Sequence, residues 1–109
     1  MRTLDVYYNE TKAGMLTELN RGTSYTFKYE QEYLSSDLPP ISATLSKRED
    51  AFESDLLFPF FSNMIPDGAN RVVICRTLRI DDMDFFGILS AMADKDFIGA
   101  VSIRTSSHD

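Results

Sequence analysis

Apolar and polar positions alternate along the first thirty residues, which is the pattern of half-buried β-strands. Leu4, Val6 and Tyr8 fall on one face of a first expected strand. A second strand is expected over residues 13–19, as a hairpin partner of the first, and a third over residues 25–30, where three aromatic residues share one face. The chain therefore begins with strands of an antiparallel sheet.

The middle of the chain is less regular. Pro39-Pro40 excludes a helix at that point, and residues 41–45 are expected to form a short strand after it. In residues 54–63 the apolar positions have helical spacing, and Pro59 suits the first turn of a short helix. This segment is therefore predicted to be helical.

Two more helices are expected, over residues 69–79 and 85–92, the second of them capped by Asp81 or Asp82. Residues 98–103 are predicted to form a closing strand. Strands first, helices next and a last strand indicate an α+β domain: a small antiparallel β-sheet packed with about three to four short helices.

The length of 109 residues and the 43% of hydrophobic residues are enough for one globular domain with its own core. We place this domain at residues 1–104 and a polar C-terminal tail at residues 105–109. The net charge of −6 has the wrong sign for direct binding to the phosphates of nucleic acids. The longest apolar run, residues 72–75, is too short to span a membrane.

Side chains suited to catalysis or metal binding are few. Cys75, the only cysteine, is expected to be a buried thiol. The lack of a second cysteine for a disulfide fits a reducing compartment such as the cytoplasm. His108 lies in the polar tail, away from groups that could orient it as a base. Asp81, Asp82 and Asp84 lack the spacing of a calcium loop and are explained by helix capping. We expect no enzyme activity, no cofactor and no metal.

Two segments carry features that a plain core does not require. Residues 56–61 are dense in large apolar side chains, which form either core or a docking surface for another protein. In residues 63–68 a helix end, a proline and a glycine follow in quick order. Such a connection is either a simple helix–helix turn or a protruding loop that presents Met64 and Ile65.

These segments carry a resemblance to a known family. Phe-Phe-Ser-Asn-Met-Ile-Pro-Asp-Gly at residues 60–68 resembles the phenylalanine-asparagine-leucine-leucine-proline-glutamate-glycine motif of the HipA N-terminal subdomain, with conservative departures at Met64, Ile65 and Asp67. Other segments are similar to this family in order and spacing: residues 4–7, Gly14, and residues 39–42, 84–89 and 96–101. The resemblance covers essentially residues 3–104 and implies the fold of that subdomain.

The resemblance also implies a function. In HipA-type toxin kinases this subdomain precedes a much larger core that holds the ATP site and the catalytic aspartate, whereas this sequence stops at Asp109. We therefore expect a protein similar to the HipS-type antitoxins of tripartite HipB–HipS–HipT systems, which bind and neutralise the HipT kinase. The expected partners are a HipT/HipA-like kinase and, through it, a HipB-like helix-turn-helix protein.

An alternative is a structural subunit that bridges the kinase and the DNA-binding partner without inhibiting the kinase. Inhibition itself has two routes, blocking of the kinase cleft or locking of an inactive conformation, and the residues do not decide between them. We expect seven residues to form the partner-binding surface: Phe60, Phe61, Asn63, Met64, Ile65, Pro66 and Asp67.

Overall fold

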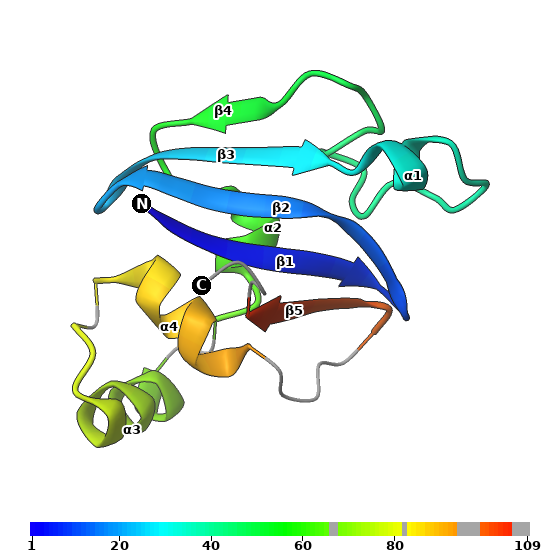
Figure 1. Ribbon diagram of the computed structural model, residues 1–109. Coiled ribbons are helices and arrows are strands. Elements are labelled where there is room, and N and C mark those ends of the chain that lie inside the picture. Colours follow the sequence, from blue (N-terminus) through cyan, green and yellow to red (C-terminus); the bar gives the residue numbers. More distant parts are fainter. Residues whose placement is uncertain (66–67, 82, 94–98, 106–109) are drawn as a thin grey trace.

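A computed structural model describes the chain except for residues 66–67, 82, 94–98 and 106–109. Its described part contains a five-stranded antiparallel sheet in the order β4-β3-β2-β1-β5 (Figure 1). The strands are β1 (Arg2–Tyr8), β2 (Thr11–Asn20), β3 (Thr23–Tyr29), β4 (Phe52–Ser54) and β5 (Val101–Thr105). The helices are α1 (Gln31–Leu34), α2 (Pro59–Ser62), α3 (Gly68–Leu78) and α4 (Phe85–Met92).

One face of the sheet carries the core. Val6 pairs with Gly14 of β2 on one side and with Ile103 of β5 on the other, and Leu16 of β2 pairs with Phe27 of β3. These side chains are buried because successive residues of a strand point to opposite faces, so one register places all of them on the same side. The absence of a side chain at Gly14 is required here, because a Cβ would lie 2.8 Å from the Phe27 ring.

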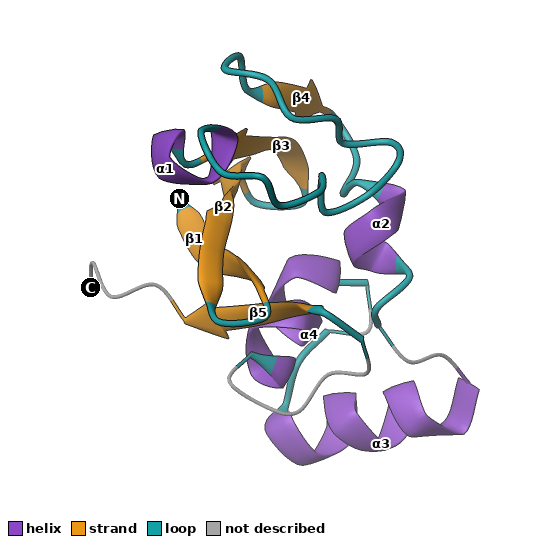
Figure 2. Ribbon diagram, turned by 90° about the vertical axis from the view of Figure 1, so that its right-hand side faces the viewer, coloured by secondary structure: helices purple, strands orange, loops and turns teal. Residues whose placement is uncertain are grey.

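The helices differ in how deeply they are buried. Figures 1 and 2 show α4 lying between the sheet and α3, and α4 contacts β5, α2 and α3. Phe86, Ile88 and Leu89 of α4 are buried in the core, whereas in α3 only Cys75 is buried. Helix α3 is therefore a peripheral element that packs on the chain mainly through α4.

At the other end of the sheet, tyrosine side chains hold a long loop. The rings of Tyr29 and Tyr33 stack with their centroids 5.6 Å apart. The Tyr29 hydroxyl donates to the Leu45 carbonyl and accepts from the Ile41 N–H at 3.1 Å, and Lys47 Nζ donates to two carbonyls of the same loop. Burial raises the pKa of the Tyr29 hydroxyl and raises that of Tyr33 to about 12. Both hydroxyls therefore stay protonated throughout the neutral range.

The α+β class, the antiparallel sheet and the number of helices are confirmed. The predicted strand at residues 41–45 is wrong: this segment is a turn with an isolated bridge between Ser42 and Leu45, since the Tyr29 hydroxyl binds backbone groups that a strand would use. The predicted helix at residues 54–63 is only α2, because Phe52–Ser54 form the edge strand β4 beside β3.

The chain end and the cap of α4 also differ from expectation. Thr105 is the last residue of β5 rather than part of a polar tail, and residues 106–109 lie outside the described residues. The cap of α4 is Asp84, which accepts from the Gly87 N–H at 3.1 Å. Asp81 instead accepts from the Met83 N–H at 2.9 Å, and Asp82 is not among the described residues.

The fold predicts a strong dependence on Phe61. This ring is fully buried and lies 5.7 Å from Phe27, so the substitution Phe61→Ala leaves a cavity between α2 and the sheet. We expect a loss of about 3–5 kcal/mol in the free energy of unfolding, measured by urea denaturation. The control Leu56→Ala, at a side chain that is 75% exposed, should change it by less than about 0.5 kcal/mol. A loss of similar size in both variants would contradict this assignment of the core.

Candidate partner-binding surface

The expected binding segment begins with the short helix α2. Pro59 occupies its first turn, where the missing N–H costs no hydrogen bond, and Phe58 precedes it as the N-cap residue. After the helix the chain continues in tight turns: the Met64 N–H donates to the Phe61 carbonyl at 3.1 Å, and the Ile65 N–H donates to the Ser62 carbonyl at 3.1 Å. These bonds fix the backbone from α2 to Ile65.

Two of the seven expected binding residues belong to the core. Phe61 is fully buried, with the rings of Phe60 and Phe58 at 5.3 and 6.3 Å, and Ile65 is also buried. Their side chains cannot reach a partner while the domain is folded. This corrects the expectation that they are direct anchors, since they support the surface from beneath. Pro66 and Asp67 lie outside the described residues.

The other three expected residues do lie at the surface. Phe60 and Met64 are half-buried and Asn63 is exposed. Together they line a hollow of about 370 Å³ that is completed by Ala100 and Val101, at the start of β5. The expected segment is thus brought next to the closing strand, which sequence spacing alone does not indicate.

A second group of apolar residues lies on the other side of Asn63. A hollow of about 300 Å³ is lined by Ser62, Asn63, Ile65, Arg71 and Phe85. A neighbouring hollow of about 370 Å³ shares Ser62 and Phe85 with it and includes Leu56 and Met83. Leu56 and Met83 are 75% and 68% exposed and are, after Met1, the most exposed large apolar side chains in the described part of the chain. We call Leu56, Met83 and Phe85 the apolar rim.

The sequence pattern does not single out the apolar rim as a site. It places Leu56 only within the apolar segment 56–61, and Met83 and Phe85 only in a cap region and a helix. The useful signal was the surplus of large apolar residues, because a domain of this size does not bury all of them. Which of them remain outside depends on the packing of α2 against α4, and this is a tertiary property.

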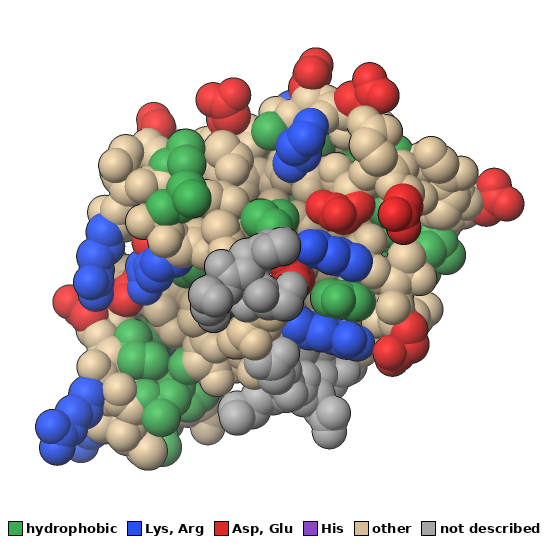
Figure 3. All heavy atoms as spheres, viewed as in Figure 1, with side chains coloured by type: hydrophobic (Ala, Val, Ile, Leu, Met, Phe, Trp, Pro, Cys, Tyr) green, Lys and Arg blue, Asp and Glu red, His purple; other side chains and the backbone are tan. Residues whose placement is uncertain are grey.

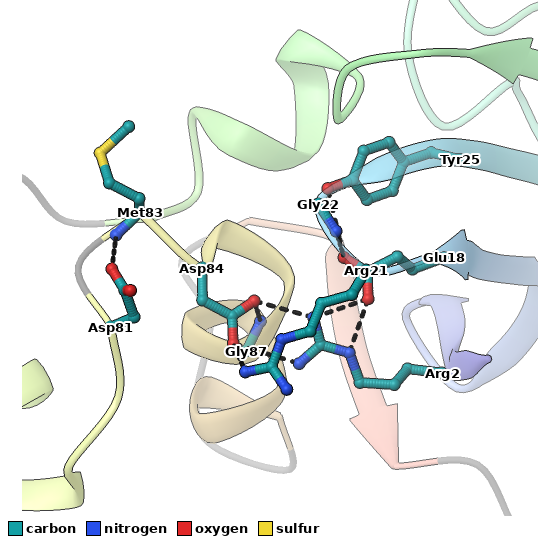
Figure 4. Close-up of polar contacts among 9 residues, drawn as sticks. All are labelled: Arg2, Glu18, Arg21, Gly22, Tyr25, Asp81, Met83, Asp84 and Gly87. Carbon is teal, nitrogen blue, oxygen red and sulfur yellow. Dashed lines mark hydrogen bonds and ion pairs between the residues drawn. The ribbon is translucent and has the colours of Figure 1, made fainter.

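A polar cluster fixes the position of the apolar rim (Figure 4). Arg2 donates from Nε to Glu18 at 2.7 Å and from Nη2 to Asp84 at 2.8 Å. The other Glu18 oxygen accepts from the Gly22 N–H at 3.1 Å and from the Tyr25 hydroxyl at 3.2 Å. The buried Glu18 carboxylate is thus fully paired, and Arg2 links β1 and β2 to the N-terminus of α4.

The Arg2–Asp84 pair changes the titration of both groups. The hydrogen bonds from Arg2 lower the pKa of Asp84, with a further contribution from the Gly87 N–H. The same contact raises the pKa of the Arg2 guanidinium. Because Asp84 directly precedes Phe85, this ion pair also holds the start of α4, and with it Phe85, in place.

Candidate groups for other chemistry are not assembled in the described part of the chain. Cys75 is a free, buried thiol, as expected. His108 lies outside the described residues. Among the residues that are described, no three His, Cys, Asp or Glu side chains are grouped to hold a metal ion, and no helix has the length and apolar character to cross a membrane.

Comparison with known proteins places the chain in a family. The sequence model of the HipA N-terminal domain matches residues 4–104. The chain belongs to this family. The solved structure of the "N-terminal domain of HipA toxin" has the same fold, with a TM-score of 0.72 at 23% sequence identity, over 100% of this chain and 96% of that one.

Two relatives show how the HipA N-terminal domain occurs in other proteins. An "Uncharacterized protein" of Haemophilus influenzae is 32% identical over 91 residues, which cover 84% of this chain and 80% of that protein. The "Putative kinase Y4mE" of Sinorhizobium fredii is 27% identical over 104 residues, which are 94% of this chain but only 24% of that protein. This chain therefore spans about a quarter of the length of its kinase-named relative.

The polar cluster predicts a pH-dependent contribution to stability. Because folding lowers the pKa of Asp84, its ion pair stabilises the fold above the ordinary aspartate pKa of about 3.9, and this contribution is lost as the pH falls through the lower folded value. Asp84→Asn keeps a capping side chain but removes the charge, so we expect a loss of about 2 kcal/mol at pH 7. Thermal unfolding between pH 7 and pH 2.5 would measure it.

The difference between wild type and Asp84→Asn should begin to shrink below about pH 4, where the carboxyl group is protonated in the unfolded chain, and should disappear only below the lower pKa of the folded protein. The matched control is Asp81→Asn, at an exposed residue in the same loop that has no ion pair among the described residues. An Asp84→Asn deficit that stays constant down to pH 2.5 would show that the charge does not stabilise the fold.

Proposed function

We propose that this protein is a non-catalytic antitoxin subunit that binds and neutralises a HipA/HipT-type serine/threonine kinase toxin. The observation that carries the proposal is an exposed apolar rim beside fixed hollows, on a chain that belongs to the HipA N-terminal domain family. Exposed large apolar side chains grouped on a small domain are typical of a protein-binding site.

The two relatives support this proposal in different ways. The Sinorhizobium protein named as a kinase contains this domain together with a much longer remaining chain, so a HipA N-terminal domain accompanies a kinase there. The Haemophilus protein is covered over 80% of its length, so in that protein the domain makes up most of the chain. A domain that accompanies a kinase in one protein and stands nearly alone in another is suited to re-form the same contact non-covalently.

The geometry of the apolar rim suits such a contact. Leu56 and Met83 supply apolar area that is already exposed, so binding gains their burial without opening the core. Asn63 lies between the hollows and offers an amide for hydrogen bonds at their edge. The backbone bonds after α2 and the Arg2–Asp84 pair hold these groups in place before binding, which lowers the entropy cost of association.

The direct test is binding and growth rescue with the HipA-type kinase of the same genome. We expect Leu56→Asp and Met83→Asp each to raise the dissociation constant at least about tenfold, because an unpaired carboxylate would be buried in the interface. Both variants should also lose rescue of growth when the kinase is expressed. Leu19→Asp, at an exposed apolar residue of β2, is the matched control and should bind as wild type does.

The alternative, a subunit that bridges the kinase to a HipB-like DNA-binding protein without inhibiting it, gives a different result. The kinase would then remain toxic when only this protein is co-expressed, although the two proteins co-purify. Continued toxicity in that experiment would overturn the antitoxin function. Failure of wild-type protein to bind the kinase at all would overturn both.

A further inference from the structure

Helix α3 has apolar residues on a face that is largely exposed to solvent. Towards the domain, Cys75 is buried and the Arg71 guanidinium lies 5.2 Å from the centroid of the Phe85 ring of α4. On the rest of its circumference, Val72 and Val73 are 48% and 61% exposed. A helix that is apolar on both sides but packed on only one is suited to a second contact.

The exposed residues form a regular stripe. Ala69, Val72, Val73 and Arg76 are all exposed and follow each other at i, i+3, i+4 and i+7. Residues at this spacing lie on one face of a helix. We call these four residues the outer face of α3. In Figure 3, viewed as in Figure 1, hydrophobic side chains gather at the lower left, over α3, with basic side chains at its outer end.

The charge of this region is opposite to that of the whole protein. Residues 68–80 contain Arg71, Arg76 and Arg79 and no acidic residue, so the rest of the chain carries a net charge of −9. Arg76 and Arg79 are exposed, and neither forms an ion pair with any residue that the structure describes. Two exposed arginines that have no ion pair among the described residues thus lie beside an exposed apolar stripe.

The end of α3 adds an independent observation. Arg79 has a φ of 57°, in the left-handed region that favours glycine, and the Ile80 N–H closes the helix by donating to the Cys75 carbonyl at 2.9 Å. An arginine is strained at this position, where glycine would not be. Its side chain makes no hydrogen bond, ion pair or ring contact with the described residues. The left-handed backbone ends the helix, but the exposed arginine side chain makes no contact of these kinds within the described fold.

We propose that the outer face of α3, with Arg79, is a second docking surface, which binds an acidic and apolar surface of the same kinase partner. This inference rests on the proposed function and adds a contact on the far side of α3 from α4. The valines supply apolar area and the two arginines pair with carboxylates, so the partner must present both. The arginines also attract an acidic patch at long range and so increase the association rate.

The test is the affinity of variants for the HipA-type kinase, measured by isothermal titration calorimetry at low and at high ionic strength. Val73→Glu replaces valine by a better helix former, so α3 should stay folded while the dissociation constant rises at least about tenfold. Arg76→Gln should weaken binding about three- to tenfold and reduce its salt dependence. Leu19→Glu and Lys28→Gln, on the sheet, are the matched controls and should behave as wild type.

Arg79→Gly separates binding from folding. Glycine relieves the left-handed backbone, so the unfolding temperature should stay the same or rise, while the affinity for the kinase falls. A role of Arg79 in the fold alone would instead lower the unfolding temperature and leave the affinity of the folded protein unchanged.

The outcomes also distinguish other occupants of this surface. Wild-type binding to the kinase with unchanged affinity in Val73→Glu, Arg76→Gln and Arg79→Gly would overturn the second docking surface and leave the proposed function intact. It would equally be overturned if these variants affected only self-association in light scattering, or only binding to vesicles of anionic lipid. Absence of any kinase binding by the wild type would overturn the proposed function itself.

Discussion

The arrangement of the sheet and α4 depends on the hydrogen bonds that the Arg2 guanidinium donates to two carboxylates. It joins the buried carboxylate of Glu18 on β2 to Asp84, and Asp84 in turn caps α4 through the Gly87 N–H. One side chain from the first residue of β1 thereby sets where the last helix begins. Because Phe85 and Met83 flank Asp84, the same contact also holds these two apolar residues at the edge of a hollow.

A core of limited size explains why these apolar side chains stay exposed. Phe61, Phe27 and Phe86 fill the space between the sheet, α2 and α4, and each is fully or almost fully buried. Leu56 and Met83 lie outside this packed space and stay exposed. Under the proposed function, their burial on binding adds apolar contact area without opening the core.

Much of the fold follows from local pattern, and the exceptions share one cause. The strands of the first thirty residues and α4 were predictable because their apolar periodicity extends over whole elements, whereas α3 was predicted as the helical stretch after a cluster of breaker residues. The failures, at residues 41–45 and 54–63, occur where a distant group decides: the Tyr29 hydroxyl binds the first segment, and β3 pairs with Phe52–Ser54. Likewise the expected binding segment was chosen by composition, but burial of Phe61 and Ile65 depends on α2 meeting the sheet.

Net charge was the least informative property, because it averages over regions of opposite sign. A net charge of −6 suggests a uniformly acidic protein. The only charged residues between positions 68 and 80, however, are Arg71, Arg76 and Arg79. Since screening limits interactions between exposed charges to roughly 8–10 Å at physiological ionic strength, a partner at α3 responds to these arginines and to the neighbouring Asp81 more than to carboxylates elsewhere on the protein. An uncharged apolar rim on one side and a basic, apolar helix face on the other would let one partner be bound at two chemically different places. Two such contacts resist dissociation together far better than either does alone, because loss of one leaves the other in place.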